Sequence, residues 1–455
     1  MQSREDSYRL ATASAFGHAR LESCWPTARL GRADVVPGEC MGRFAATGES
    51  WKFEGTNPGD SVSGNGDPLE NLAQAFRSIC AIAPNAGMIG YLAYEFGYDL
   101  LDLPVPFQTV PGIRVPECQF LFFDNLDFPA ARSFDSDALR KPRSYARDEL
   151  MSLIGNPRVR AFTSWRQYEE SVRKIKAHIR AGDIYQANLT QAFDVQTQRE
   201  GPEIYEALKQ INPAPFSAYL RFEPVRIGST SFPAIEILSS SPERFWRKDR
   251  RHIETRPIKG TIGRGGSRLE DKERLRKLLT SAKDHAELLM ITDLLRNDVG
   301  RCADIGSVHA PILRRARACA SVWHLESVVT GRVADQTGWE DVMRSLFPGG
   351  SVTGAPKRRA AEILSRLENV PRGVYCGAIG WVDAAGDCDF ALPIRTTVKS
   401  GALVRIHGGG GIVADSDAES EYEESLVKIA PILECLCGAD ETENRGRTYH
   451  ACEGS

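Results

Sequence analysis

Residues 402–436 read ALVRIHGGGGIVADSDAESEYEESLVKIAPILECL and combine a strand pattern, a run of glycines and an amphipathic helix. The residues of 402–407 predict a strand, and a helix is predicted from Asp417 to about Leu436. Residues three and four positions apart are neighbours on a helix, so this helix carries two distinct faces. The apolar face consists of Tyr422, Leu426, Ile429 and Leu433. The charged face consists of Glu421, Glu424 and Lys428.

The four glycines between this strand and helix, Gly408–Gly411, leave backbone N–H groups free to approach an anion closely. A glycine loop beside clustered acids and a lysine suits a carboxylate ligand that is bridged by a metal ion. The alternative is a flexible turn followed by a solvated helix face. Taken alone, the spacing favours that alternative, so other segments must decide.

Glu287 lies within a strongly apolar segment that is predicted to be helical and that ends in Asp293–Asp298. A carboxylate in apolar surroundings is costly unless it is paired or bound to a metal. Mg²⁺ prefers few protein carboxylates together with substrate oxygens and water, so Glu287 is a candidate magnesium ligand. The alternative is that Glu287 faces solvent or pairs with an arginine.

Lys259 lies in the string RPIKGT (256–261), where Pro257 and Gly260 bracket a short turn. A lysine held in a desolvated pocket loses its proton more readily and becomes a nucleophile. Glu243, in SSPERF (240–245), is a candidate proton donor and acceptor. The ordinary alternatives are a surface cation for Lys259 and an ion pair between Glu243 and Arg244.

The composition is that of a globular enzyme: 455 residues, 42% hydrophobic and 26% charged. The length corresponds to roughly three domain equivalents. A formal net charge of −3 leaves no basic field to recruit nucleic acid or a membrane surface. The 11 cysteines form no Cys-x-x-Cys motif and indicate reduced thiols rather than a disulfide framework. With no apolar leader and no apolar run of about 20 residues, we expect a cytoplasmic protein.

In the N-terminal part, residues 45–70 are rich in Gly, Ser, Asn and Asp and predict an irregular loop. Residues 87–94 place glycines among aromatic residues, which predicts a strand with close backbone approach. Residues 130–165 are polar and predict a connection to the remainder of the chain.

Further along, a helix is predicted from residue 165 to Gly182, and residues 268–298 predict two helical pieces with a capping box at Ser281. Residues 372–407 alternate short apolar runs with turns, which predicts a sheet. The mixture indicates an α+β protein with large antiparallel sheets.

Six stretches together resemble the chorismate-utilising enzymes, and they come in that family's order over about residues 165–430. They are GDIYQANL (182–189), SSPERF (240–245), PIKGT (257–261), DLLRNDVGR (293–301), FPGGSVTGAPK (347–357) and residues 408–424. The resemblance implies an anthranilate synthase component I-like fold, in which two large antiparallel sheets pack together with helices on the outside. It also implies an N-terminal region over 1–155, a chorismate-binding region over 160–437 and a polar tail over 438–455.

The resemblance assigns roles by position. Glu287 and Glu424 resemble the ligands of one Mg²⁺ that would hold the ring carboxylate of chorismate, with Glu421 close to the metal. The catalytic positions are matched by Lys259, Glu243 and His324, of which Glu243 resembles the general acid/base. A core histidine is the ordinary alternative for His324. The substrate-binding positions are matched by Gly260, Thr261, Tyr375, Arg395, Gly409, Gly410, Gly411 and Lys428.

Lys259 distinguishes among branches of the family. Pro-Ile-Lys-Gly-Thr resembles the aminodeoxychorismate synthase branch, whereas anthranilate synthases usually carry Ala or Met at the lysine position. The resemblance then implies that Lys259 attacks C2 of chorismate and that ammonia adds at C4. The rival interpretation is anthranilate synthase component I. No Gly-x-Cys-x-Gly glutaminase signature is evident, so the resemblance implies a separate glutamine amidotransferase partner.

Two further segments resemble the tryptophan pocket of relatives. They are Leu21-Glu22-Ser23 and residues 212–218, and the candidate contacts are Ser23, Phe216, Ser217 and Ala218. A plain loop is the alternative at Leu21-Glu22-Ser23. The chain departs from the family pattern at Ile262, where relatives often carry a basic residue, and this puts one local contact in doubt rather than the reaction.

Overall fold

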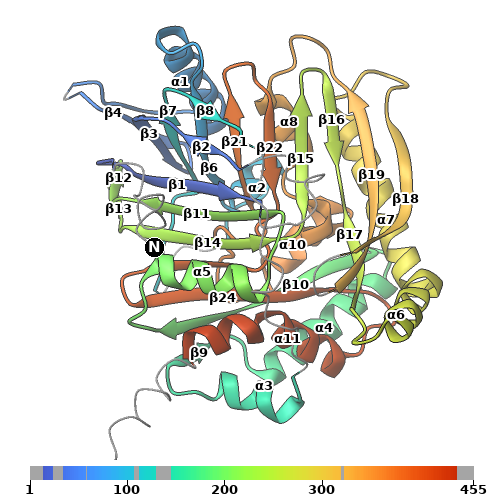
Figure 1. The fold of residues 1–455 in the computed structure, drawn as a ribbon. Coiled ribbons are helices and arrows are strands. Elements are labelled where there is room, and N and C mark those ends of the chain that lie inside the picture. Colours follow the sequence, from blue (N-terminus) through green and yellow to red (C-terminus); the bar gives the residue numbers. More distant parts are fainter. Residues whose placement is uncertain are drawn as a thin grey trace, which may run out of the picture.

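The computed structural model describes residues 14–23, 34–57, 59–106, 112–129, 145–318 and 322–437. Within these ranges, two large antiparallel sheets pack face to face, and helices cover the outer side of each sheet (Figure 1). In Figure 1 the strands of one sheet run across those of the other at a steep angle, which is one of the two common ways in which sheets pack. The predicted α+β class with two packed antiparallel sheets is confirmed.

The first sheet has the strand order β1-β11-β14-β23-β24-β10-β20, and β9 pairs with β10. Its strands are β1 (Gly17–Glu22), β9 (Val159–Ala161), β10 (Gln186–Gln196), β11 (Phe216–Phe222), β14 (Ile235–Ser241), β20 (Gly354–Ala355), β23 (Thr396–Ser400) and β24 (Leu403–Ile412). The predicted strand over residues 402–407 is confirmed as part of β24.

The second sheet has the strand order β17-β19-β16-β15-β22-β21-β6-β7-β3-β4-β5, and β18 pairs with β19. Its strands are β3 (Cys40–Thr47), β4 (Ser50–Gly55), β5 (Val62–Asn65), β6 (Gly87–Leu92), β7 (Cys118–Phe123), β15 (Arg244–Asp249), β16 (His252–Thr255), β17 (Ile258–Gly263), β18 (His309–Ala318), β19 (Val322–Arg332), β21 (Ala378–Asp383) and β22 (Cys388–Ala391). Because β6 pairs with β21, the N-terminal strands continue the sheet that the C-terminal part builds. Two short ribbons pair β2 (Val36–Pro37) with β8 (Leu126–Asp127) and β12 (Val225–Ile227) with β13 (Thr230–Phe232).

The layer between the two sheets is a separate apolar core, because successive side chains of a strand point to opposite faces. On β6, Tyr91 points into this inner core while Leu92 packs in the outer core of its sheet. From the facing sheet, Phe222 meets the Tyr91 ring edge to face, with centroids 5.5 Å apart. Such a pair contributes about 0.5–1.5 kcal/mol beyond the area it buries.

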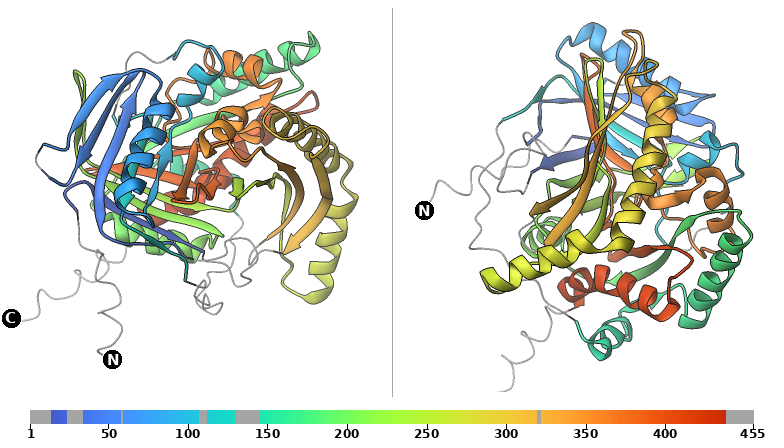
Figure 2. Two further views of the ribbon diagram at one scale, coloured as in Figure 1. Left: turned by 90° about the horizontal axis from the view of Figure 1, so that it is seen from above. Right: turned by 90° about the vertical axis from the view of Figure 1, so that its right-hand side faces the viewer.

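Helices cover the two outer faces, as Figure 2 shows for α6 and α7 along one side of the molecule. The first sheet is covered by α3 (Arg147–Ile154), α4 (Trp165–Arg180), α5 (Gly201–Ile211), α10 (Lys357–Leu364) and α11 (Ala418–Cys437). The second sheet is covered by α1 (Pro68–Ile82), α6 (Arg268–Thr280), α7 (Ala282–Gly300) and α8 (Trp339–Leu346). Two further helices are short: α2 (Phe96–Leu100) and α9 (Gly350–Thr353). Helix α9 contacts α7, α10 and strand β10.

Several local predictions are confirmed. The helix after residue 165 is α4, and the break in residues 268–298 falls at Ser281, whose side chain accepts a hydrogen bond from the Asp284 backbone N–H. The predicted apolar face of α11 is buried. The close approach on β6 occurs at Gly90, where a Cβ would lie 2.1 Å from the Gln119 carbonyl oxygen.

The predicted loop over residues 45–70 is wrong. This segment holds the end of β3, then β4 and β5, and the start of α1. Gly64 serves packing, because a Cβ there would lie 2.8 Å from the Trp51 ring, which itself stacks on Phe44. Gly48, Gly59 and Gly66 instead adopt a positive φ. The polar Asp67 is the N-cap of α1, which Pro68 begins.

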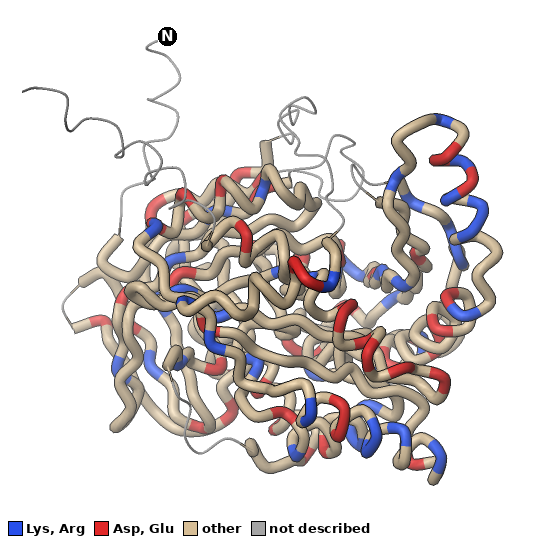
Figure 3. The backbone as a smooth tube through the Cα atoms, turned by 90° about the horizontal axis from the view of Figure 1, so that it is seen from below, with Lys and Arg blue, Asp and Glu red and all other residues tan. Residues whose placement is uncertain are grey.

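The predicted polar connection over residues 130–165 is described from residue 145 onward, and there it contains α3 and β9 rather than a linker. The predicted tail over 438–455 lies outside the described residues. Across the ranges that the structure describes, no helix is long and apolar enough to cross a membrane. In Figure 3, segments carrying acidic and basic residues are interspersed, so that view shows no continuous face of one sign.

Candidate active site

One cavity of about 550 Å³ brings together every residue that the sequence predicted as catalytic, substrate-binding or metal-binding. Its walls come from both sheets and from helices α7, α9 and α11. These residues are separated by up to 185 positions in the chain, from Glu243 to Lys428. Their convergence on one cavity therefore depends on the packing of the sheets and not on any local motif.

Glu243 lies in the short connection between β14 and β15, with only 5% of its surface exposed. The Ser351 hydroxyl donates a hydrogen bond of 2.9 Å to Glu243 Oε1. Burial raises the pKa of the Glu243 carboxyl to about 7, although Lys259 and the Ser351 hydrogen bond both oppose the rise. Glu243 can therefore exchange a proton near neutral pH, as a general acid or base must. Arg244 pairs instead with Asp389 and Glu254, which removes the simple ion-pair alternative for Glu243.

Lys259 lies on β17, where the ladder with β19 shifts register between Lys259 and Thr261. Gly260 absorbs the shift with φ +73°, a conformation that L side chains rarely adopt. The Lys259 ammonium donates to the Ser351 carbonyl oxygen over 3.5 Å. Burial lowers the pKa of Lys259, and the nearby Glu287 and Glu243 only partly oppose the effect. The side chain thus lies inside the cavity and not in bulk water.

The predicted turn at Pro257–Gly260 is wrong, because these residues lead into β17 and Gly260 forms a bulge in it. His324, on β19, lies opposite Thr261 and is buried. Its Nδ1 shares a hydrogen bond of 2.7 Å with the Thr261 hydroxyl. Burial, helped by Arg317 and Arg395, lowers the pKa of His324 to about 3, so the ring is neutral at pH 7. A neutral imidazole can donate or accept a hydrogen bond but brings no charge to the cavity.

The cavity is also lined by the three carboxylates predicted to lie near a metal: Glu287 on α7, and Glu421 and Glu424 on α11. Burial raises the pKa of Glu287 and also that of Glu421, which accepts a hydrogen bond of 2.7 Å from the Ser416 hydroxyl. Glu424 differs, because its ion pair with Lys428 at 2.8 Å lowers its pKa. Glu424 is therefore the carboxylate held most firmly in its charged form.

These carboxylates fit Mg²⁺ in kind, because they offer only hard oxygen donors. Among the described residues, however, no group of three or more metal-binding side chains is gathered closely enough to cage an ion. A site built from Glu287 and Glu424 would thus need oxygen atoms from the substrate and from water, which is the arrangement that Mg²⁺ favours.

The predicted glycine loop is wrong, because Gly408–Gly411 form part of β24 and pair with β10. The neighbour on the other side, β23, pairs with β24 only up to Ile406. In an antiparallel ladder, every second residue of a strand turns its N–H and C=O groups away from the paired strand. Gly409 is such a residue of β24, because its carbonyl oxygen accepts from Lys428 Nζ at 2.8 Å. The free edge of a strand, and not a loop, therefore presents the N–H groups of Gly409 and Gly411 to the cavity.

Tyr375 and Arg395 also line the cavity. The Tyr375 ring stacks on His407 with centroids 5.2 Å apart. Arg395 adopts φ +53°, and its Nη1 donates to Asn212 Oδ1 at 2.7 Å. A non-glycine residue in the left-handed region is strained, and such strain often marks functional sites.

Sequence reasoning gave no role to Ser351, Asn188, Lys283 and His407, which also line the cavity. Ser351 and Asn188 belong to strings that carry the family resemblance, and that was the available signal. Their residue types suggest no chemistry until the fold places Ser351 against Glu243 and Lys259. Lys283 lies 3.9 Å from Glu287, four residues further along the same helix.

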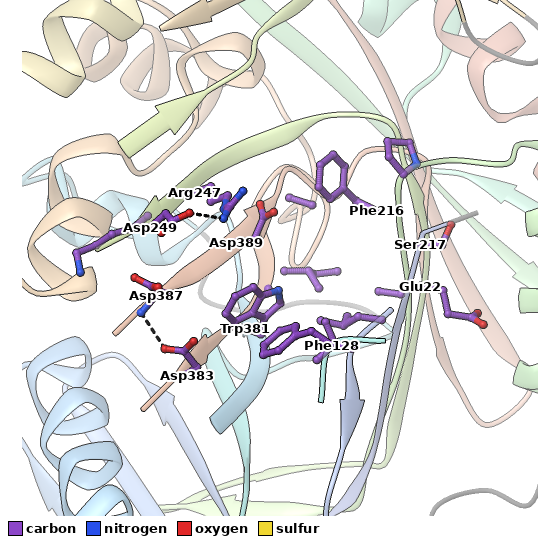
Figure 4. A pocket seen from close by; sticks show the side chains of 18 residues that line it. Glu22, Phe128, Phe216, Ser217, Arg247, Asp249, Trp381, Asp383, Asp387 and Asp389 are labelled. Atoms are coloured by element: carbon purple, nitrogen blue, oxygen red, sulfur yellow. Dashed lines mark hydrogen bonds and ion pairs between the residues drawn. The ribbon is translucent and has the colours of Figure 1, made fainter. Parts of the chain in front are cut away.

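A second cavity, of about 260 Å³, lies where the two segments of the predicted tryptophan pocket meet (Figure 4). β1 pairs with β11, so that Glu22 lies opposite Ser217 and Leu21 opposite Ala218. Phe216, Ser217 and Ala218 line the cavity, together with Trp381 and Phe128. Ser23 is buried beside the cavity but does not line it, and its backbone N–H donates to Asp34.

The packed sheets and the main cavity define the class of protein: two antiparallel sheets enclose one cavity that is lined by Lys259, Glu243 and the glutamates of α7 and α11. The chain belongs to the chorismate binding enzyme family, whose model matches residues 32–434.

The chain is similar to two kinds of protein within this family. Aminodeoxychorismate synthase component 1 of Klebsiella aerogenes is 41% identical over 402 residues, which cover 83% of this chain and 85% of that protein. The same component from Salmonella typhimurium is 43% identical over 270 residues, which cover 59% of this chain and only 57% of that protein. Anthranilate synthase component 1 of Aquifex aeolicus is 37% identical over 385 residues, covering 78% and 75%. In fold, the chain resembles the crystal structure of anthranilate synthase component I from Streptococcus pneumoniae, with a TM-score of 0.67, 24% identity and coverage of 88% and 91%.

Proposed function

We propose that this chain aminates chorismate at C4 as aminodeoxychorismate synthase component I, with Lys259 as a covalent nucleophile. The observation that carries the proposal is the position of Lys259, which shares one cavity with Glu243 and the glutamates and has a depressed pKa. A neutral amine can attack carbon, whereas an ammonium cannot. The relatives named aminodeoxychorismate synthase component 1 support the assignment.

In the proposed reaction, the Lys259 amine forms a bond to C2 of chorismate, the ring double bonds shift, and the C4–O bond breaks. Glu243, protonated near neutral pH, gives its proton to the departing hydroxyl, which leaves as water. Ammonia then adds at C4, the Lys259–C2 bond breaks, and the ammonium formed at C4 returns a proton to the Glu243 carboxylate, which restores both side chains. The sum is chorismate plus ammonia giving 4-amino-4-deoxychorismate plus water, so atoms and charges balance.

Substrate carboxylates would be held from two sides. Bound Mg²⁺ would supply Lewis-acid neutralisation of the ring carboxylate, and Glu287 and Glu424 are the residues that would hold it. Arg395 can contact a carboxylate through two parallel N–H groups. The N–H groups at the free edge of β24 offer further donors at the same wall of the cavity.

Anthranilate synthase is the second candidate, because a protein of that name is also similar over most of this chain. The two activities differ in where nitrogen enters the ring, at C4 or at C2. Lys259 favours amination at C4, since a nucleophile bonded to C2 blocks that carbon from ammonia.

The direct test is to incubate the protein with chorismate, ammonium and Mg²⁺ and to identify the amino product by mass and retention time. The proposal predicts 4-amino-4-deoxychorismate and, on rapid quenching, a chorismate-derived adduct that peptide mass spectrometry maps to Lys259. Anthranilate as the main product would reject the assignment. The matched control is Lys399→Ala, which removes a buried lysine that pairs with Glu236 and does not line the cavity.

We further propose that ammonia reaches this chain from a glutamine amidotransferase subunit and that the second cavity binds tryptophan. The partner is supported by the designation of the relatives as component 1. The tryptophan site is supported by the aromatic and acidic lining of the second cavity, which includes Trp381 and Asp389. Glutamine-dependent activity that appears only when the amidotransferase subunit is added would test the partner.

A further inference from the structure

Arg372 is among the most deeply buried charged residues of the described chain, with 2% of its surface exposed. Its guanidinium lies 4.2 Å from the centre of the Tyr94 ring and pairs with Glu368 through both Nε and Nη2. Burying an ion pair is expensive, and its energy alone seldom explains why it is present. The remaining hydrogen bonds of Arg372 give a more specific reason.

Two of those bonds end at residues that line the main cavity. Arg372 Nη1 donates to the Val352 carbonyl oxygen and Nη2 donates to the Asn188 carbonyl oxygen, both at 2.7 Å. Glu368, the partner of Arg372, in turn accepts from the backbone N–H and the hydroxyl of Thr190. One guanidinium thus joins α9 to β10.

Helix α9 is only four residues long, so its own hydrogen bonds cannot fix its position. Ser351, in this helix, makes the contacts that matter: its hydroxyl donates to Glu243 and its carbonyl oxygen faces the Lys259 ammonium. Tyr94, stacked on Arg372, ties the same helix a second time, because its hydroxyl donates to Thr353 Oγ1 at 3.2 Å.

We propose that Arg372 is a positioning residue, which holds α9 so that Ser351 keeps the Glu243 carboxyl aligned for proton transfer beside Lys259. Arg372 touches neither the cavity surface nor the reacting atoms. It acts through two links, from its guanidinium to the Val352 carbonyl and from Ser351 to Glu243. This inference deepens the proposed function and rests on it for its catalytic meaning.

Arg372→Lys keeps a charge for Glu368 but cannot span the two carbonyl groups at once, and Lys and Arg are not interchangeable at such sites. We expect kcat to fall on the order of 100-fold, as displaced catalytic groups typically cause, with a much smaller change in KM for chorismate. Ser351→Ala should lower kcat in the same way. In the double variant the two losses should not add, because both break one chain of contacts.

A matched control is Arg43→Lys. Arg43 is equally buried, pairs with one glutamate, Glu54, and donates to two backbone carbonyl oxygens, those of Glu223 and Pro224. It lies on β3, and none of these partners lines the main cavity. Arg43→Lys should therefore leave kcat close to that of the unmodified protein.

A second measurement needs no substrate. The groups that face Glu243 are Lys259, Arg317, Ser351 and the Ile258 backbone N–H, and the Ser351 bond lowers the pKa of Glu243. The pKa of Glu243 can be measured from stability. The free energy of unfolding is compared, as a function of pH, between the protein with Glu243 and its Glu243→Gln variant. In the Arg372→Lys background, the midpoint of this pH-dependent difference should move to higher pH. The same shift is expected with Ser351→Ala.

The outcomes test the proposed function and the role of Arg372 separately. If the unmodified protein does not aminate chorismate, the proposed function fails, while the unfolding midpoint still tests the positioning role. An unchanged midpoint in the Arg372→Lys background, or losses in kcat that add in the double variant, would overturn the role of Arg372.

Discussion

Replacing Glu243 with glutamine should stabilise the fold above pH 7 while abolishing the proposed proton transfer. Glu243 is 5% exposed and its pKa is raised to about 7, against 4.5 for an ordinary glutamate. The unfolded chain loses this proton at the ordinary value, so between pH 4.5 and pH 7 the folded protein binds more protons than the unfolded chain. Stability therefore falls as pH rises through this window.

The size of the effect follows from the gap of 7 − 4.5, about 2.5 pH units. At about 1.4 kcal/mol for each unit, the charged carboxylate costs the fold about 3 kcal/mol above pH 7 and nothing below pH 4.5. Glutamine has nearly the same shape, can still accept from Ser351 and carries no charge. For a chain of 455 residues the gain corresponds to a rise in Tm of roughly 3 °C.

Urea unfolding of both proteins at pH 5, 6, 7 and 8 measures the difference, and Glu419→Gln is the control. Glu419 is a half-exposed carboxylate at the start of α11, where ion pairs contribute little. The stabilisation from Glu243→Gln should grow from pH 5 to pH 8, while chorismate amination falls by 10²- to 10⁴-fold, as general acid/base losses typically do. A stability difference that does not vary with pH would refute the reasoning.

Three further outcomes are expected. Lys259→Ala should lose chorismate amination by at least about 1000-fold without losing stability at pH 7, because it removes a desolvated cation; substantial remaining C4 amination would contradict the covalent role. Glu424→Gln should raise the Mg²⁺ concentration for half-maximal activity by at least about 10-fold, whereas the neighbouring Glu423→Gln should not, and equal metal titrations would argue against ligation. Ala218→Trp should fill the second cavity and remove tryptophan binding in a calorimetric titration; heat that persists unchanged would place tryptophan elsewhere.

The parts of the fold that sequence predicted well are those with a strong periodic pattern. The helical spacing in α4 and α11 follows from one buried face, and the Ser281 break follows from a capping side chain. The segment over residues 45–70 failed because its composition resembles a loop. Only the packing of Trp51 over Gly64 shows why a glycine is needed inside a strand pair.

The candidate site also has parts that the sequence predicted and parts that it did not. The acids and lysine on α11 could be placed on one face from spacing alone, and Glu243, Lys259 and Glu287 could be named from their residue types and strings. The free edge of β24 could not be predicted, because it exists only where the shorter β23 stops pairing at Ile406. Nor could the role of Ser351 be predicted, since it depends on the placement of a four-residue helix between two sheets.

The N-terminal region contributes to this site although none of its residues lines the main cavity. Glu95, in the connection between β6 and α2, accepts hydrogen bonds from the backbone N–H groups of Arg372 and Gly373. Tyr94 stacks on the guanidinium of the same arginine. The backbone that carries Arg372 toward α9 and leads into Tyr375 is thus fixed from the N-terminal strands. A chorismate-binding region separated from those strands would keep Lys259, Glu243 and the glutamates in its sequence but lose the contacts that hold Arg372 in place. Its expected defect is therefore a lower kcat, because Glu243 would lose its alignment. The proposed Mg²⁺ ligands on α7 and α11 should be less affected.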